Sequence, residues 1–316
     1  MPETNTLSLC VVCGADDGWR AFSTREMLLG TRRPFVYTEC AQCLSVQLMN
    51  PPADLSPYYP DNYYSFQPGS RDSEEPRWTK KMLAGLLVDS RLPGTRLLAA
   101  MLKESHPLGH WSRICGVRRS DSILDVGCGH GALLRRMRRW GFTNLVGIDP
   151  SARQEARLPG LTIRRAELKD IDQRFDLIML HHVLEHVADP VLMLRLAAGC
   201  LRAGGRILVR LPLAASYAAR RFGADWFALD PPRHLAIPSL RGFECLARRA
   251  NLTVRHREFD STALTFEMSE FYRRDIPFTS VPDFEARVAR SPFRSLVKTL
   301  NCTEEADAGV FVLTPE

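Results

Sequence analysis

Short apolar runs alternate with longer amphipathic stretches from about residue 121 onward. The runs are rich in Val, Ile, Leu and Phe, and they lie at 122–126, 144–149, 161–167, 175–180, 206–212, 252–259 and 309–315. Apolar runs separated by helical stretches are typical of parallel strands that are joined by right-handed crossovers. The pattern predicts an α/β fold with a doubly wound, mostly parallel, seven-stranded sheet of Rossmann-like type.

Helices are expected between these strands, at 131–141, between residues 149 and 161, and at 189–205. The stretch 261–308 separates the last two predicted strands and is longer than a simple hairpin needs. We expect a mostly helical insertion there, which covers a pocket or makes a homodimer contact. The sheet and this insertion together predict one large domain over residues 118–316.

The N-terminal region, residues 1–50, is predicted to be a small zinc ribbon. Cys10 and Cys13 form one CxxC pair, and Cys40 and Cys43 form a second. Two such turns can place four thiolates about 2.3 Å from one Zn²⁺ and close its tetrahedral shell. A closed shell leaves no open position for catalysis, so a structural zinc is expected; a redox CxxC is the alternative.

Residues 51–117 are expected to connect the two parts as a Pro/Tyr-rich linker and a helical connector. The first part of this range is dense in Pro, Tyr and charged residues, and residues 78–117 give two basic amphipathic stretches. The connector is interpreted as a cover for the sheet edge, with a membrane-surface helix as the alternative. Four tyrosines of the linker are expected to pack on the large domain or to line a pocket: Tyr58, Tyr59, Tyr63 and Tyr64.

The stretch "ILDVGCGHGALL", residues 123–134, places Gly127, Gly129 and Gly131 between the first predicted strand and a helix. Glycines there allow a sharp turn and let a flat ligand approach the backbone without meeting a Cβ atom. The stretch also fits a dinucleotide fingerprint, so the glycines alone leave NAD(P) and another adenosine cofactor open.

Carboxylates at the strand ends favour an adenosine cofactor other than NAD(P). Asp125 ends the first strand, where it would oppose the pyrophosphate of a dinucleotide but suits the ammonium of a methionine moiety. Asp149 ends the second strand and can accept hydrogen bonds from both hydroxyls of a ribose. Glu167 follows the third strand, at the place where an adenine amino group would be read.

Four motifs over roughly residues 120–260 make the sequence resemble the class I S-adenosylmethionine-dependent methyltransferases. They are "ILDVGCGHG", "VGIDP", "FDLIMLHHVLEHVADP" and "LRAGGRILVRLP", in the order and spacing of that family. The resemblance implies an enzyme with S-adenosyl-L-methionine as cofactor. It also implies that Asp125 and the three glycines contact the methionine end, Asp149 the ribose and Glu167 the adenine, while His181 flanks the sulfonium.

The cysteine pairs narrow the resemblance. "CVVCG" and "YTECAQCLSVQLMNPP" joined to such a domain look like a bacterial group with an N-terminal zinc-binding segment, which includes sugar methyltransferases of secondary-metabolite and surface-polysaccharide pathways. The stretch "WFALDPPRHL" is also similar to that group. The expected acceptor is therefore a small molecule: a sugar, a lipid-linked compound or another cell-envelope or secondary metabolite.

Methyl transfer to a hydroxyl or an acidic carbon needs a base that removes a proton. His234, in "DPPRHL", is our leading candidate, because two prolines restrict its loop and an imidazole titrates near neutral pH. In the alternative interpretation, Arg233 and His234 hydrogen-bond a loop or cap the helix that begins near Ser239.

A second candidate site is "HHVLEHV", in which His182, Glu185 and His186 have the spacing i, i+3 and i+4. On a helix this spacing brings the three side chains to one face, where they could act in catalysis or bind a divalent metal. Ubiquinone-biosynthesis O-methyltransferases are locally similar, but their metal-linked motif has Glu where this chain has His182. Packing and orientation of the helix is the alternative.

The net charge of +6 is unevenly distributed. Residues 1–79 hold 6 Arg and 10 Asp or Glu, a net of −4, so the remainder carries +10. An RNA methyltransferase would use the basic part, but a Cys₄ zinc site adds further negative charge to the acidic part, which disfavours nucleic acid. A non-catalytic zinc-ribbon protein with a methyltransferase-like scaffold is a third hypothesis.

No apolar run approaches the roughly 20 residues that cross a bilayer, and "MPETNTLSLC" lacks the features of a signal peptide. A cytoplasmic location is therefore expected, where nine cysteines favour metal binding or burial over disulfides.

Overall fold

The computed structural model describes residues 9–60 and 107–316. Contacts divide the chain into two compact units, each assembled from separate stretches of sequence. Unit 1 comprises Met1–Pro60, His182–Arg195 and Arg210–Phe311. Unit 2 comprises Asp61–His181, Leu196–Val209 and Val312–Glu316. The elements and sites of each unit are described separately below.

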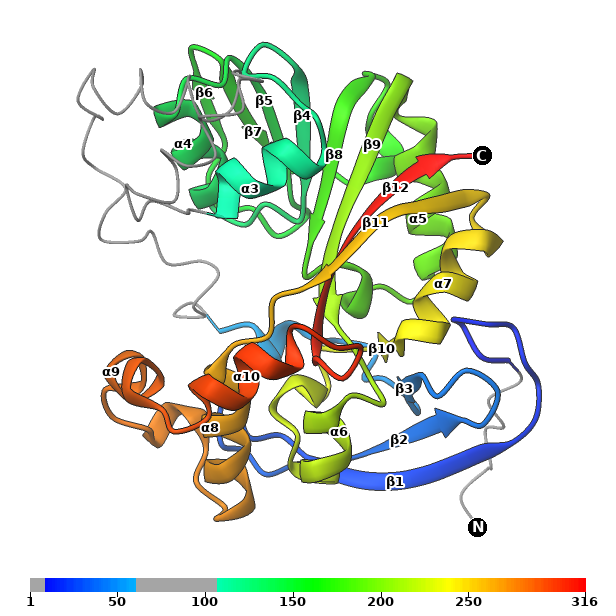
Figure 1. Cartoon of the computed structure of the whole chain (residues 1–316), viewed down its shortest axis with the longest axis vertical. Helices are drawn as coiled ribbons and strands as arrows, with labels where there is room; N and C mark the ends of the chain where they lie inside the picture. The colour runs from blue at the N-terminus through cyan, green and yellow to red at the C-terminus, as the bar shows by residue number, and fades with distance from the viewer. Residues whose placement is uncertain (1–8, 61–106) are drawn as a thin grey trace. The chain divides into compact units, whose positions relative to one another are not determined.

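Eight strands form the large sheet (Figure 1). They are β4 (Ser122–Val126), β5 (Asn144–Ile148), β6 (Ala156–Leu158), β7 (Leu161–Arg164), β8 (Phe175–His181), β9 (Leu201–Pro212), β11 (Leu252–Phe259) and β12 (Ala308–Pro315). Their order is β11-β12-β9-β8-β4-β5-β7-β6, and β4 pairs in parallel with both β5 and β8. The doubly wound, mostly parallel sheet is confirmed, and all seven predicted strands are present.

The eighth strand, β6, stands where the sequence predicted a helix, between residues 149 and 161. That prediction was wrong. The segment "SARQEARLPG" is closed by Pro159 and Gly160, which form a tight turn, and β6 pairs antiparallel with β7 so that Leu158 lies opposite Leu161. Gly160 has a φ of 77°, and a Cβ atom there would lie 2.8 Å from the carbonyl oxygen of Thr143. The turn therefore requires glycine, and a hairpin replaces the crossover helix.

The helix expected at 189–205 is shorter in the structure. α5 spans Pro190–Gly199, and residues 201–205 already belong to β9. Glycine lowers helix propensity by about 1 kcal/mol relative to alanine, so Gly199, Gly204 and Gly205 favour an early helix end. Leu201 is buried within the strand. The apolar side chain of Leu201 is therefore buried in the sheet and not on the helix.

Unit 2 has its core between the central strands and a few short helices. Its described helices are α3 (Pro107–Ile114), α4 (Ala132–Arg139) and the 3₁₀ helix η3 (Leu168–Asp170). Figure 1 shows α4 beside β5 and β7. Ile123, Leu124 and Ile178 are fully buried on paired strands, and Leu134 of α4 is fully buried as well. Burial of a side chain of this size stabilises the fold by about 1.5–3 kcal/mol.

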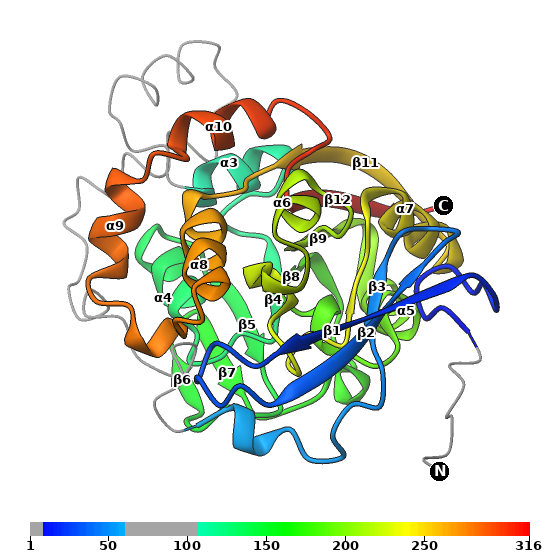
Figure 2. The same ribbon diagram turned by 90° about the horizontal axis from the view of Figure 1, so that it is seen from below.

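Unit 1 contains a second, antiparallel sheet. Its strands are β1 (Trp19–Arg25), β2 (Pro34–Cys40), β3 (Val46–Leu48) and β10 (Ala236–Ile237), in the order β1-β2-β3-β10. Figure 2 shows β1 and β2 running side by side as its two long strands. The fourth strand comes from a distant part of the sequence, so the N-terminal sheet is completed only by residues 236–237.

The predicted insertion at 261–308 is helical, as expected. The helices of unit 1 are η1 (Ser56–Tyr58), η4 (Leu184–His186), α6 (Tyr217–Phe222), η5 (Gly223–Asp225), η6 (Phe227–Leu229), α7 (Leu240–Arg249), α8 (Ala263–Arg273), η7 (Phe278–Ser280), α9 (Phe284–Arg290) and α10 (Arg294–Leu300). Phe266 of α8 and Val297 of α10 join one buried cluster with Tyr37 of β2 and Trp226. The insertion therefore shares its core with the N-terminal segment.

Only the first part of the predicted linker can be placed. Tyr58 is buried in the core of unit 1, as the packing interpretation expects, whereas Tyr63, Tyr64 and residues 78–106 lie outside the described residues. In the described ranges, no helix is long and apolar enough to cross a membrane.

Candidate functional site

The glycine loop after β4 has the backbone conformation that its composition predicts. Gly127, Gly129 and Gly131 have φ values of 69°, 55° and 78°, in the left-handed region that favours glycine. A Cβ atom on Gly131 would lie 2.2 Å from Cδ1 of Ile163. The loop therefore leaves no space for a side chain at this position, and helix α4 begins directly against β7.

Two carboxylates accompany this loop at the ends of β4 and β5. Asp125 is buried, and its burial together with the charge of Asp149 raises the pKa of Asp125 to about 8. Asp149 accepts hydrogen bonds from the backbone N–H of Gly129, at 2.9 Å, and of Ser151, at 2.7 Å. A cationic group placed beside Asp125 would favour its ionised form. These residues thus fit the ammonium and the hydroxyls of an S-adenosylmethionine molecule.

The other two residues expected to contact the cofactor are Glu167 and His181, which lie in different surroundings. Glu167 follows β7, is half exposed, and pairs with Nζ of Lys169 at 2.7 Å. His181 is the last residue of β8, and its ring centroid lies 4.6 Å from that of Trp111 on α3. Trp111 was missed by the sequence analysis, because an aromatic residue in an amphipathic helix gives no signal of where it packs.

The structure brings together Glu185, His186 and His234, which we call the Glu–His cluster. One ligand atom from each residue lies within 4.8 Å of the others. His182 is not a member, although the spacing predicted that it would share a helical face with the other two. The segment forms the short 3₁₀ helix η4, and His182 precedes it with a left-handed φ of 54°.

Backbone carbonyls fix the tautomers of both histidines in the cluster. Nδ1 of His186 lies 2.9 Å from the carbonyl oxygen of Arg233, and Nδ1 of His234 lies 2.7 Å from that of Ala228. A carbonyl oxygen only accepts, so each Nδ1 carries the proton and each Nε2 keeps its lone pair. Burial and the neighbouring His234 lower the pKa of His186 to about 4. His186 is therefore neutral at pH 7.

Glu185 is fully buried and ionised. Burial raises its pKa, but the hydrogen bond from His182 and the charges of the nearby histidines outweigh this and lower the pKa to about 2. His182 Nδ1 donates to Oε1 of Glu185 at 3.0 Å, and Nε2 of His182 lies 3.0 Å from Nη1 of Arg210, which also pairs with Asp260. Both ring nitrogens of His182 are thus engaged.

The second carboxylate oxygen of Glu185, Oε2, is buried and has no hydrogen-bond partner within the part of the chain that the structure describes. A buried carboxylate oxygen without a donor is costly, so it is suited to accept a hydrogen bond or to bind a cation. The Glu–His cluster can therefore act as a proton acceptor, and its donor set, two imidazoles and a carboxylate, is also one that divalent transition metals use.

The four paired cysteines converge as their spacing predicted. Sγ of Cys10 lies 3.8 Å from Sγ of Cys43, and Sγ of Cys13 lies 3.7 Å from Sγ of Cys40. A tetrahedral ion with Zn–S bonds of about 2.3 Å holds its sulfur atoms about 3.8 Å apart, so the geometry fits zinc. Burial raises the pKa of Cys13 to about 11, so these thiols would release protons when they bind a metal.

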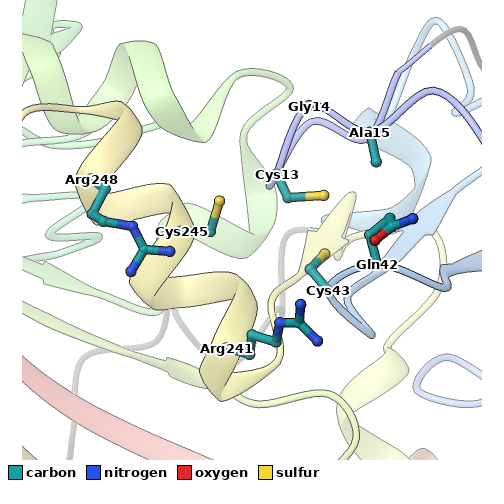
Figure 3. Close-up of a pocket in the computed structure, with 8 residues that line it drawn as sticks. All are labelled: Cys13, Gly14, Ala15, Gln42, Cys43, Arg241, Cys245 and Arg248. Carbon is teal, nitrogen blue, oxygen red and sulfur yellow. The ribbon is translucent and has the colours of Figure 1, made fainter.

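A cavity of about 420 Å³ lies beside this cluster, between the CxxC turns and α7. Figure 3 shows Arg241, Cys245 and Arg248 on α7 with Cys13 and Cys43 across from them. The lining of this cavity thus combines two arginines of α7 with two cysteines of the cluster. All nine cysteines are free, and the other five do not join the cluster.

Comparisons with known proteins show which family the chain belongs to. Residues 96–257 match a family described as "Methyltransferase domain". A ubiquinone biosynthesis O-methyltransferase of Cereibacter sphaeroides is 38% identical over 119 residues, which cover 33% of this chain and 47% of the relative. An enzyme of the same name from Xanthomonas oryzae is 32% identical over 126 residues, which cover 35% of this chain and 52% of the relative.

The chain spans about half the length of these curated relatives. Among solved structures, an S-adenosylmethionine dependent methyltransferase from Mesorhizobium loti is similar, with 18% identity and a TM-score of 0.43 over 64% of this chain and 94% of that one. The matched domain covers just over half of the present sequence, and the sheet order agrees with the expected fold. The chain therefore belongs to the methyltransferase domain family, and its resemblance to the class I methyltransferases is confirmed.

Proposed function

We propose that the protein transfers a methyl group from S-adenosylmethionine to a small-molecule acceptor. The observation that carries this proposal is the buried Asp125, which adjoins the left-handed glycine loop and Asp149. A buried carboxylate whose pKa is raised lacks a cationic partner, and the ammonium of the cofactor would supply one. The ribose would be held by Asp149 and the adenine by the region of Glu167, while His181 would flank the sulfonium.

The cofactor supplies an electrophilic methyl group, and this chain's own residues orient the acceptor and take its proton. We assign the proton to Nε2 of His234, because Nδ1 is already bonded to the carbonyl of Ala228. In an in-line displacement the acceptor's lone pair forms the new bond to carbon while the carbon–sulfur bond breaks, so the acceptor must lose one proton. The ionised Glu185 would stabilise the imidazolium that results.

His186 and His182 would support this step in different ways. His186 is neutral at pH 7 and lies at 4.6 Å, between ring centroids, from His234. It would accept a hydrogen bond from the acceptor through Nε2. His182 would act through Glu185, since both of its ring nitrogens are engaged. The acceptor expected from the sequence is a sugar, a lipid-linked compound or another small metabolite.

A divalent cation in the Glu–His cluster is a second candidate, favoured by the unbonded Oε2 of Glu185 and by the two Nε2 lone pairs. A histidine that binds a metal through one ring nitrogen commonly donates the N–H of the other to a carbonyl oxygen. His186 and His234 both have Nδ1 at a backbone carbonyl in this way. Elemental analysis of the purified full chain distinguishes a cluster that binds a metal from one that does not. One zinc per chain supports a cysteine site alone, whereas a second metal that is lost in Glu185→Gln supports metal in the cluster.

The test of the proposed function uses S-adenosylmethionine labelled in its methyl group and a fractionated extract of the host. Label in a glycan, nucleotide-sugar or lipid-linked fraction supports the proposal, and label in RNA contradicts it. His234→Ala should lower the rate at least about a hundredfold, the usual contribution of a general base. His256→Ala is the matched control, because His256 also pairs with a carboxylate, Glu258, but lies outside the cluster.

A further inference from the structure

Tyr37 of β2 reaches the loop that carries His234 (residues 228–235, the His234 loop). Its ring is completely buried, and its hydroxyl lies 2.6 Å from the carbonyl oxygen of His234 and 3.0 Å from that of Leu229. A hydroxyl donates one proton, and the shorter distance favours His234 as the acceptor. Burial raises the pKa of Tyr37 well above its ordinary value, so the donor is retained at neutral pH.

Arg233, the residue before His234, has no exposed surface and is held from two sides. Its Nη2 lies 2.6 Å from Oδ1 of Asp230 in the same loop and 2.9 Å from Oε1 of Glu26 in the N-terminal segment. Glu26 is also fully buried. Asp230 pairs Arg233 within the loop, whereas Glu26 supplies the buried carboxylate that ties the Arg233 side chain to the N-terminal segment.

The carbonyl group of Arg233 links this ion pair to the Glu–His cluster, because it accepts the proton of His186 Nδ1. Leu235, the residue after His234, also connects the cluster to the N-terminal segment. Its carbonyl accepts from the backbone N–H of Leu48 at 2.8 Å, and its own N–H donates to the carbonyl of Glu185 at 2.6 Å. Backbone groups that orient all three cluster residues are thus bonded, directly or through one residue, to the N-terminal segment.

The sheet continues the same connection toward the cysteines. β10 follows the His234 loop and pairs with β3, so that Ile237 lies opposite Val46. Ser239, the N-cap of α7, donates its hydroxyl proton to the carbonyl of Cys43 and its backbone N–H to Oγ of Ser45, the latter at 3.1 Å. The loop is therefore attached at both of its ends to the segment that holds the cysteine cluster.

We infer that the N-terminal segment is a positioning element for the Glu–His cluster, with Tyr37 and Glu26 as the positioning residues. They hold the carbonyl groups that set the ring orientation of His186 and the backbone of His234. This inference rests on the proposed function, in which the orientation of His234 determines the rate. It implies that kcat depends on residues outside the cluster, whereas cofactor affinity, assigned to residues of unit 2, does not.

The test compares Tyr37→Phe with Thr38→Val in the full chain. Thr38 is the next residue of β2 and is also buried, but its hydroxyl bonds only within the N-terminal segment, to the carbonyl of Gln47. Tyr37→Phe should lower kcat at least about tenfold and leave KM for S-adenosylmethionine within about twofold. It should also shift the ¹⁵N resonances of the ring nitrogens of His234 at pH 7. Thr38→Val should change neither.

A folded Tyr37→Phe protein with the wild-type kcat and wild-type ring-nitrogen resonances would overturn the inference. Wild-type protein that transfers no methyl group in any fraction contradicts the proposed function instead, and the histidine resonances then decide the inference by themselves. If Tyr37→Phe does not fold, as judged by circular dichroism, Glu26→Gln takes its place with the same expectations for kcat, KM and the resonances of His186.

Discussion

The raised pKa of Asp125 predicts that cofactor binding is coupled to the release of a proton. In the free protein this carboxyl is buried and keeps its proton up to a pKa of about 8. The ammonium of S-adenosylhomocysteine or S-adenosylmethionine favours the ionised form, so binding must first remove the proton wherever the pH lies below 8. Affinity should therefore rise with pH up to that value.

The magnitude follows from the distance between the pH and the pKa. At pH 6, two units below a pKa of about 8, roughly 1% of Asp125 is ionised, which lowers affinity about a hundredfold, or about 2.7 kcal/mol, relative to the fully ionised protein. The ammonium of the ligand loses its proton near pH 7.7–8.0, as α-amino groups do. The informative range is thus about pH 5.5 to 7.5, which lies below the pKa of the ligand's ammonium and of Asp125.

Isothermal titration calorimetry with S-adenosylhomocysteine checks this prediction. The logarithm of the association constant should rise by about one per pH unit, and titrations in buffers of different ionisation enthalpy should show nearly one proton released per ligand. Asp125→Asn should bind weakly at every pH without this slope. An affinity that is flat between pH 5.5 and 7.5, or a slope that persists in Asp125→Asn, would refute the assignment.

The same residue should affect stability in the opposite direction. A carboxyl whose folded pKa of about 8 exceeds its ordinary value of 3.8 binds its proton more tightly in the folded state, so stability falls as the pH rises from about 4 to 8. Asp125→Asn avoids this cost and should be more stable than wild type at pH 7, by up to about 4 kcal/mol. A thermal melt at pH 5 and pH 8 measures the difference, which should be larger at pH 8.

Three further predictions concern other parts of the chain. His182→Ala removes the hydrogen bond that helps to keep the pKa of Glu185 at about 2. In the wild type, the stability that ionised Glu185 contributes is lost as the pH falls from about 4.5 to 2, and in the variant it should be lost at higher pH. The midpoint of acid unfolding, followed by circular dichroism, should therefore move to higher pH. Chelation of zinc or Cys13→Ser should remove one metal per chain and lower the melting temperature, whereas unchanged metal content would contradict the cysteine site. Gly131→Ala should destabilise the protein by about 1–3 kcal/mol in urea and weaken cofactor binding, because its φ is 78° and its space is filled, while Gly199→Ala, with open space around it, should not.

Most of the fold could be predicted from local sequence patterns. The seven apolar runs became strands, and Gly127, Gly129 and Gly131 adopt the conformation that glycine favours, because both properties are decided within a few residues. The same holds for the cysteines, since each CxxC turn preorganises its own pair. The helix expected between β5 and β7 was wrong for a local reason too, because Pro159 and Gly160 form a hairpin turn and the residues before them pair with β7.

The Glu–His cluster required information that local spacing does not contain. The i, i+3, i+4 pattern grouped His182 with Glu185 and His186. His182 does contact Glu185, but the third member of the cluster is His234, which comes from a loop distant in sequence. Tyr37 is an ordinary buried aromatic until its hydroxyl is seen at the carbonyl of His234. Pairings between residues roughly 50 to 200 positions apart leave no trace in periodicity.

The pairing of β3 with β10 also constrains the order of events during synthesis. Val46 leaves the ribosome about 190 residues before its partner Ile237, at a pace of about 5–20 residues per second, so the strand edge at β3 stays open for roughly ten seconds or more. Open strand edges are templates for association with other chains. The CxxC turns can bind a metal during this interval, because all four cysteines precede β3. Early metal capture would then hold the nascent sheet in register and protect it from aggregation until its last strand is made.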